Sequence, residues 1–357
     1  MGHILPTGCR ETCPYAYPRH PRHYRLPDRK RGVKPGFWRG KHVLVTGGAG
    51  FLGSGLCHAL GALGAQVTAL DAMLDGTGAH PANLEGSGAT LLRADLRDSD
   101  LASAVTGLDA VFNLAAQTSH AGSMADPFTD LAINAEAQLR LIAALRQGSP
   151  AATVVHASTR QFYGTPRYLP VDEAHPLAPP DANGISKLAG EQYWLLEHKV
   201  HGRPVVSLRL TNCYGPRLRV RDARQTFLGI WFRRLLEGQP FEVWGGEQLR
   251  DLAYLDDVVA AFLLAAETPA CAGRAFNLGG SAPVSLLQLA EAAVAANGAG
   301  RFVIKEFPAE RAAIDIGSYH ADDSAFRAAT GWAPETTLDQ GLRRSLDWFR
   351  PRLSAYV

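Results

Sequence analysis

The sequence predicts an α/β protein in which a doubly wound parallel sheet is joined to a smaller α/β lobe. From residue 41 onward, short β-branched runs alternate with stretches of helical periodicity, which is the pattern of repeated βαβ units. The first of these runs leads directly into the glycine-rich segment 47–53 and then into an amphipathic stretch. After residue 210 the rhythm changes to an arginine-rich helix and short runs separated by Gly and Pro, which indicates a second lobe.

Six runs are predicted to be the strands of the sheet. Each is short and apolar on both faces, as a sheet between two helix layers requires, and they cover residues 42–46, 66–70, 90–93, 110–114, 153–157 and 205–210. Apolar residues at helical spacing predict helices between these strands, from Leu52 to Leu63 and from Leu131 to Leu145. Further helices are expected near 222–238, 285–297 and 338–350.

The charge balance gives no reason to expect nucleic acid or a membrane surface as a partner. The chain carries 36 Lys and Arg against 34 Asp and Glu, a net charge of +2. The first 40 residues differ, because they hold nine basic residues, two acids and six prolines. We predict that residues 1–40 form a weakly ordered basic arm.

Location is predicted from apolar runs and cysteines. The opening residues hold no apolar run of the kind a secretory signal needs, and no run approaches the ~18 apolar residues of a membrane span. The five cysteines, at 9, 13, 57, 213 and 271, are too scattered for a disulfide framework. The spacing of Cys9 and Cys13 fits no zinc pattern. We expect a soluble, cytoplasmic protein without a metal site.

The segment 43–53 is the strongest local motif, a strand followed by a G-x-x-G-x-x-G turn and a helix. In such a turn Gly47 permits the tight bend, Gly50 lets the backbone approach a pyrophosphate, and Gly53 lets the helix lie close to the sheet. Asp71 ends the next strand, where a carboxylate accepts from ribose hydroxyls and repels a 2′-phosphate, which favours NAD over NADP. The predicted residues are Gly47, Gly50, Phe51, Leu52, Gly53 and Asp71.

Five further segments follow the glycine turn, at 94–98, 113–117, 158–164, 209–217 and 249–257. With these motifs the chain resembles the extended short-chain dehydrogenases that modify nucleotide sugars, relatives of UDP-galactose 4-epimerase and dTDP-glucose 4,6-dehydratase. The resemblance spans about residues 41–350. It implies a Rossmann-type sheet, NAD as cofactor and a nucleotide-diphosphate sugar as substrate.

The resemblance also implies the domain organisation. We expect an NAD-binding domain over 41–210, with a return segment at about 252–280 that crosses back to the sheet. The substrate lobe is expected to comprise 211–251 and 281–357.

Cofactor contacts are implied at two of these segments. Asp95 and Leu96 resemble the residues that hold the adenine, and Ala115, Ala116 and Gln117 resemble those beside the nicotinamide ribose. Helices at about 128–147 and 184–200 resemble the family's four-helix dimer contact, so a homodimer is expected.

Substrate contacts are implied in the second lobe. Asn212 and Arg250 match the residues that hold the sugar-linked diphosphate in the family. Arg217 lies in an arginine-rich run that suits a doubly charged diphosphate, with a solvated basic surface as the alternative. Arg311 and Asp315 lie where relatives contact the nucleotide's ribose or base.

The catalytic segment departs from the family at one position. Ser158 and Thr159 match the family's Ser/Thr segment, and Thr159 takes the place of the catalytic hydroxyl. The family's proton acceptor is a tyrosine four residues before a lysine. Here Lys187 is present, but Asn183 occupies the tyrosine's place, and an amide cannot take a proton near neutral pH.

Several groups could replace the tyrosine. Desolvation beside a nicotinamide ring would push Lys187 toward its neutral form, which ranks it first. His120 lies in a loop expected to face the substrate and titrates in the useful range, although a polar loop residue with one backbone bond is the alternative. Tyr163 and Cys213 are weaker candidates, because their motif positions are usually structural.

A second departure concerns the two residues after Thr159. Sugar dehydratases of this family place an acid pair there, which protonates the leaving hydroxyl and removes a ring proton. Arg160 and Gln161 cannot shuttle that proton. Arg160 could instead pair with an acid of the chain, or with a substrate carboxylate or phosphate.

We therefore predict an NAD-dependent epimerase with a non-standard base. A 4,6-dehydratase is the enzymatic alternative. A non-catalytic protein that binds NAD and a nucleotide sugar is the alternative of another class.

Overall fold

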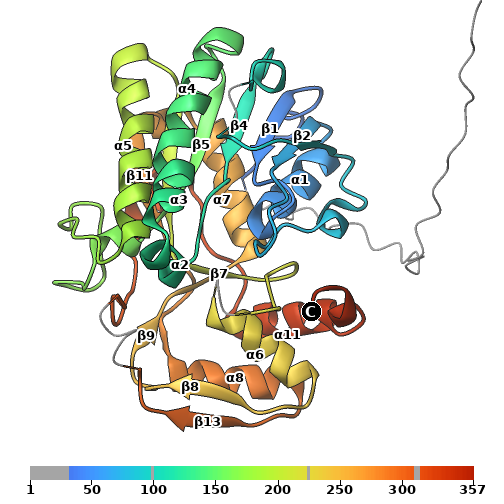
Figure 1. Cartoon of the computed structure of the whole chain (residues 1–357), viewed down its shortest axis with the longest axis vertical. Coiled ribbons are helices and arrows are strands. Elements are labelled where there is room, and N and C mark those ends of the chain that lie inside the picture. Colours follow the sequence, from blue (N-terminus) through green and yellow to red (C-terminus); the bar gives the residue numbers. More distant parts are fainter. Residues whose placement is uncertain (1–31, 98–99, 223–225, 309–313) are drawn as a thin grey trace, which may run out of the picture.

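The computed structural model describes residues 32–97, 100–222, 226–308 and 314–357. Within them, the chain forms a sheet covered by helices on both faces and a smaller lobe below its carboxyl edge (Figure 1). This is the α/β architecture predicted from the alternation of strand and helix patterns.

A seven-stranded parallel sheet forms the centre of the molecule. Its order is β11-β6-β5-β4-β1-β2-β3, and every neighbouring pair is parallel. All six predicted strands are present, and the seventh comes from the return segment expected near 252–280. The strands are β1 (His42–Thr46), β2 (Gln66–Asp71), β3 (Thr90–Arg93), β4 (Ala110–Asn113), β5 (Thr153–Thr159), β6 (Val205–Leu210) and β11 (Arg274–Leu278).

Two helix layers cover the sheet because its strands are apolar on both faces. Helices α1 (Phe51–Ala62) and α7 (Leu255–Glu267) pack on one face, and α4 (Ala137–Gly148) and α5 (Ala182–His201) pack on the other. Alternating residues of β1 supply both cores, since Val43 and Val45 join the first cluster and Leu44 joins the second. The sheet is therefore buried throughout its centre.

The segment between β4 and α4 consists of three short elements. Helix α2 (His120–Ala125) is followed by α3 (Pro127–Leu131), and a π turn (Ala132–Glu136) joins α3 to α4. Asp126 caps α3 by accepting from the backbone N–H of Thr129, with a proline as the next residue. The helix predicted from Leu131 to Leu145 is therefore present, with a π turn within its first part.

The smaller lobe contains short strands and four helices within the described residues. Serine and threonine caps with a glutamine three residues later begin α8 and α11. Its elements are β7 (Asn212–Tyr214), α6 (Phe227–Leu236), β8 (Phe241–Trp244), β9 (Leu249–Arg250), β10 (Leu252–Tyr254), β12 (Val284–Ser285), α8 (Leu286–Asn297), β13 (Phe302–Lys305), α10 (Ser324–Thr330) and α11 (Leu338–Phe349).

Short 3₁₀ helices complete the described secondary structure. They cover Pro81–Leu84, Ser103–Val105, Gln161–Tyr163, Pro269–Cys271 and Leu353–Ala355. Helix α6 begins after Thr226, whose side chain caps it, within the range 222–238 predicted to be helical; residues 223–225 of that range lie outside the described part.

The prediction of a weakly ordered N-terminal arm is wrong for residues 32–40. Trp38 is 1% exposed within the main core, and its indole N–H donates to Glu267 Oε1 at 2.6 Å. The backbone N–H of Lys34 donates to the other oxygen of the same carboxylate at 2.7 Å. Residues 32–40 therefore belong to the folded body, because a buried tryptophan anchors them, and residues 1–31 lie outside the described part.

In the described ranges, no helix combines the length and apolarity that crossing a bilayer requires. The same residues contain no group of three or more His, Cys, Asp or Glu side chains arranged to hold a metal ion. Cys57, Cys213 and Cys271 are free thiols, and Cys9 and Cys13 lie outside the described part.

Candidate active site

A cleft of about 850 Å³ opens at the carboxyl ends of the parallel strands. This is where a doubly wound sheet places its ligands, because the loops after neighbouring strands diverge there. All the residues predicted to bind the cofactor or to act in catalysis line it: Gly47, Gly50, Phe51, Leu52, Gly53, Asp71, Asp95, Leu96, Ala115, Ala116, Gln117, His120, Thr159, Asn183 and Lys187.

The glycine turn requires its glycines for steric reasons. Gly47 has a φ of +65°, and a Cβ there would lie 2.9 Å from the backbone nitrogen of Ala115. A Cβ on Gly53 would collide with the carbonyl oxygen of Gly47. Gly50 begins α1 without a side-chain cap, so the positive end of the helix faces the cleft uncovered by any capping side chain, as a phosphate requires.

Asp71 is held in place at the end of β2. Its carboxylate accepts from the backbone N–H groups of Ala49, at 3.1 Å, and Met73, at 2.9 Å. Burial raises the pKa of this carboxyl above its ordinary value, while these two bonds oppose the rise. The turn and the carboxylate together fit a dinucleotide.

Thr159 and Lys187 face the same cleft from β5 and α5. The Thr159 hydroxyl oxygen accepts the backbone N–H of Gln161 at 3.1 Å, so its own O–H stays available to a ligand. Burial lowers the pKa of Lys187 to about 8, although the nearby Asp130 carboxylate opposes the shift. The cleft wall thus carries both the Lys187 ammonium group and the Thr159 hydroxyl donor.

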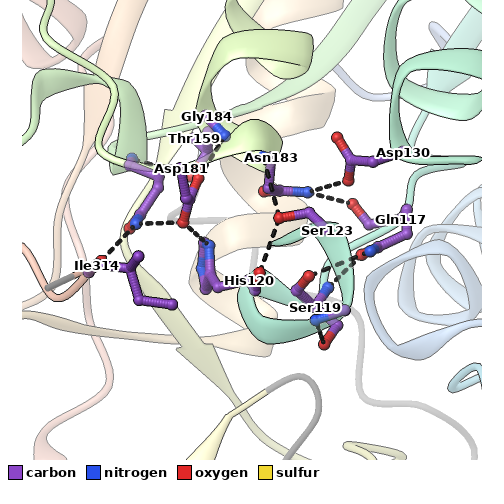
Figure 2. Close-up of polar contacts among 12 residues, drawn as sticks. Gln117, Ser119, His120, Ser123, Asp130, Thr159, Asp181, Asn183, Gly184 and Ile314 are labelled. Atoms are coloured by element: carbon purple, nitrogen blue, oxygen red, sulfur yellow. Dashed lines mark hydrogen bonds and ion pairs between the residues drawn. The ribbon is translucent and has the colours of Figure 1, made fainter. Parts of the chain in front are cut away.

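Asn183, which is predicted to stand in the place of the family's tyrosine, is part of a buried polar network. Its side-chain amide donates to Asp130 Oδ1 and to the carbonyl oxygen of Gln117, both at 2.9 Å (Figure 2). Asn134, from the π turn, donates to the same two oxygens, at 3.0 and 3.1 Å. Both N–H groups of the Asn183 side-chain amide therefore join α5 to the wall of the cleft.

The His120 side chain lies against Asp181, the N-cap residue of α5. The distance from His120 Nδ1 to Asp181 Oδ2 is 2.8 Å, and Figure 2 shows the two side chains facing each other. Gln161 Nε2 donates to the same oxygen at 2.9 Å, and the backbone N–H of Gly184 donates to Oδ1 at 2.7 Å. Burial opposes the charged form of Asp181, but the hydrogen bonds from His120, Gly184 and Gln161 outweigh it and lower the pKa of the carboxyl.

Two carboxylates of this site were not identified from the sequence. Asp130 is fully buried beneath Lys187, and Asp181 is the N-cap of α5. The helix predicted from 184 begins close to Asp181, so a capping role was readable, but its pairing with His120 depends on α2 and could not be read from spacing.

Arg160 is a buried cation beside the substrate motif. Its Nη2 donates to Asn212 Oδ1 at 3.0 Å, and its guanidinium lies over the Tyr319 ring at 4.9 Å. Its Nη1 atom is buried without a hydrogen-bond partner among the described residues. Burial and the charge of Arg250 lower the pKa of Arg160. Arg160 lines the cleft with Ser158, Gln161 and Asn212.

Other predicted substrate residues lie outside the cleft lining. Arg250 is 6% exposed and donates to the carbonyl oxygen of Gly317 at 2.7 Å and to Asp315 Oδ2 at 3.2 Å. Arg217 is buried, with its guanidinium 6.0 Å from the Trp348 ring. Arg311 falls outside the described residues. The substrate roles of these four residues remain predictions.

Comparison with known proteins agrees with this geometry. The model of the NAD dependent epimerase/dehydratase family matches residues 43–279. The chain is 32% identical over 316 residues to the UDP-glucose 4-epimerase of Mycolicibacterium smegmatis, covering 86% of this chain and 98% of that protein. It is 31% identical over 321 residues to the dTDP-glucose 4,6-dehydratase of Streptomyces niveus, covering 86% and 92%.

A solved structure shares the whole fold. The UDP-glucose 4-epimerase of Thermotoga maritima with UDP-glucose superposes with a TM-score of 0.80 at 28% identity, covering 87% of this chain and 99% of that one.

Proposed function

Because the chain belongs to the NAD dependent epimerase/dehydratase family, whose cofactor is NAD, we propose that it is an epimerase of a nucleotide-diphosphate sugar with a base other than tyrosine. One observation carries the proposal. The dinucleotide turn, Thr159, Lys187 and Asn183 line a single cleft, and we infer that Asn183 stands in the place of the family's tyrosine.

NAD, when bound, accepts a hydride from a sugar carbon and returns it. The chain's own residues hold the two reactants and move the hydroxyl proton. The glycine turn and Asp71 are proposed to hold the pyrophosphate and the adenosine ribose, with Asp95 and Leu96 at the adenine. Ala115, Ala116, Gln117 and Lys187 are proposed to surround the nicotinamide end. Thr159 donates a hydrogen bond to the reacting sugar oxygen.

Epimerisation is favoured over dehydration by the residues that follow Thr159. Loss of water needs a group that protonates the leaving hydroxyl and another that removes a ring proton. Arg160 is a buried guanidinium, and the Gln161 amide is bound to Asp181 at 2.9 Å. Neither side chain titrates near neutral pH.

Arg160 and Asn212 are proposed to bind an anionic part of the substrate. One buried nitrogen of the guanidinium has no hydrogen-bond partner among the described residues, and a phosphate or a sugar carboxylate would supply that acceptor. Ser158 borders the same region. Arg217, Arg250, Arg311 and Asp315 are proposed to complete the nucleotide site from the smaller lobe.

A homodimer is proposed from the outer surface of α5. Its exposed apolar side chains Ile185, Tyr193, Leu196 and Val200 are spaced so that they share one helix face. Leu131 and Leu139 add exposed apolar surface on the neighbouring α3 and α4. A second copy of the chain is the occupant that the same face of an identical helix pair would fit.

The function is tested by incubating the purified protein with a panel of nucleotide sugars, both neutral and carboxylated. We expect a transient absorbance of reduced nicotinamide and an NMR spectrum showing one inverted ring centre. A keto product formed with loss of water would establish the dehydratase instead. Binding of NAD and sugar without turnover across the panel would establish the non-catalytic alternative.

A further inference from the structure

The pairing of His120 with Asp181 differs from an ordinary surface contact. The His120 side chain is 41% exposed toward the cleft, whereas the Asp181 side chain is fully buried. Three donors fix that carboxylate, from His120, Gln161 and the backbone of Gly184. The carboxylate therefore cannot turn away, and it determines the orientation of the imidazole.

The tautomer of His120 follows from this geometry. A carboxylate only accepts hydrogen bonds, so His120 Nδ1 must carry the proton that it shares with Asp181. In the neutral ring Nε2 is then the bare nitrogen, able to take a proton. A buried carboxylate behind an imidazole holds the tautomer and stabilises the imidazolium when it forms, as in the hydrolase triads.

The site also links this pair to Thr159. The backbone N–H of Gln161 donates to the Thr159 hydroxyl oxygen at 3.1 Å, while its side-chain amide donates to Asp181 at 2.9 Å. One residue thus fixes a hydroxyl donor and an imidazole acceptor relative to each other. Thr159 and His120 both line the cleft in which the substrate is proposed to bind.

Other candidate bases fit the contacts less well. Both N–H groups of Asn183 are engaged, and its amide cannot take a proton. Burial lowers the pKa of Lys187 to about 8 against the opposing Asp130 carboxylate, which still leaves the amine charged near neutral pH, as suits a group that binds ribose. Burial raises the pKa of Cys213 to about 12, and the Tyr163 hydroxyl donates to Asn277 at 2.8 Å within the core.

We propose that His120 Nε2 takes the proton of the substrate hydroxyl and later returns it, with Asp181 as its positioning residue. The inference rests on the proposed function. The hydroxyl O–H bond breaks, its proton passes to Nε2, and its electrons form the carbonyl as the C–H hydride leaves to NAD. On return the same proton goes back to the oxygen, so the protein ends unchanged.

The first test replaces the acceptor with a similar shape. His120→Gln is expected to lower kcat by about 10²- to 10⁴-fold, the usual range for lost general base catalysis. The dissociation constants for NAD and the nucleotide sugar should change by less than about threefold, because the ring binds neither tightly. His201→Gln, on the exposed end of α5, is the matched control and should retain full turnover.

The second test reads the tautomer without turnover. Nitrogen NMR of ¹⁵N-histidine-labelled, cofactor-free protein should show His120 protonated at Nδ1, and Asp181→Asn should convert it to a mixture. Asparagine still caps α5, so this variant removes the charge and keeps the helix end. Its kcat should fall while its KM stays near that of the wild type.

Rescue by free imidazole distinguishes the loss of a proton acceptor from damage to the fold. Free imidazole should restore part of the turnover of His120→Gly in proportion to its concentration, and should not affect His201→Gln. Turnover above a tenth of wild type in His120→Gln, or a proton on Nε2 in the wild type, would overturn this inference alone. A wild type that turns over no nucleotide sugar would instead overturn the proposed function.

Discussion

At the scale of single residues, Asn183 has a structural part at the start of α5. Its side chain is 1% exposed and joins Asp130 to the loop after β4. We propose that it stands where the family carries a tyrosine, so that the proton chemistry comes from another side chain.

Restoring the phenol should therefore fail to restore ordinary family chemistry. Asn183→Tyr removes both hydrogen bonds that the side-chain amide donates and leaves the Asp130 carboxylate with fewer donors. This costs about 1–3 kcal/mol of unfolding free energy. We expect urea unfolding at lower concentration and no gain in kcat. A tenfold or larger increase in turnover would show that the cleft is still arranged around a tyrosine.

Motifs located some of these residues and could not locate others. Thr159 and Lys187 lie in segments of fixed spacing, so their shared cleft was predictable from the chain. Asp130 could not be identified, because its burial under Lys187 depends on the break between α2 and α3 and on the π turn after it. Nor do Arg217 and Arg250 reach the cleft lining, since each is buried in contacts of its own.

At the scale of elements, the turn between β1 and α1 shows how closely sequence and structure correspond. Its glycines are needed where backbone meets backbone, which is why this motif predicted its own geometry.

Gly53→Ala should damage both folding and cofactor binding. Its Cβ would collide with the Gly47 carbonyl, and the resulting shift of α1 costs about 1–3 kcal/mol. We expect weaker NAD binding by calorimetry together with a lower unfolding midpoint. Gly86→Ala is the control: its φ of +77° strains an alanine, but nothing lies within 4 Å of the new Cβ. It should lose stability without losing NAD affinity.

The outer face of α5 permits a test of the proposed dimer. Leu196 is 52% exposed in the middle of the apolar stripe, and a charge there would be desolvated in a dimer. Leu196→Glu should sediment as a monomer, with helix content unchanged by circular dichroism. Glu237→Lys, in the smaller lobe, should leave the mass unchanged. A wild-type monomer at micromolar concentration would contradict the dimer.

At the scale of the whole molecule, the buried His156 and the partly buried His58 link stability to pH. Burial and the charge of Lys187 lower the pKa of His156 to about 3, and burial and Arg217 lower that of His58 to about 4. Below pH 6.5 the unfolded chain takes up protons at both rings while the native state does not. The contribution of the two neutral imidazoles to the free energy of unfolding is therefore fully present above pH 6.5 and is lost as the pH falls.

Between its unfolded and its native pKa, each ring should lower the free energy of unfolding by about 1.4 kcal/mol for each unit by which the pH falls. Between pH 7 and 4.5, His58→Gln should lose about 2 kcal/mol less unfolding free energy than the wild type, as measured by urea titration. Glutamine can still donate to the Asn83 carbonyl, as His58 does at 2.9 Å. Equal losses in the two proteins would contradict a neutral His58.

The overall fold was largely predictable because parallel strands buried on both faces leave short apolar runs that turn signals separate. The inclusion of residues 32–40 was not predictable. The composition of this segment, rich in proline and basic residues, gave no sign that Trp38 is buried. Its indole N–H is bound by Glu267, which is far away in the chain.

The position of β11 has a consequence for synthesis on the ribosome. This edge strand and α7 come from residues 255–278, yet they complete a sheet whose first six strands end at residue 210. Translation at about 5–20 residues per second leaves the part of that face which α7 covers exposed for several seconds. During this interval the nascent chain exposes apolar surface to which a chaperone can bind, and the nucleotide-binding half is completed only after the first part of the second lobe has emerged.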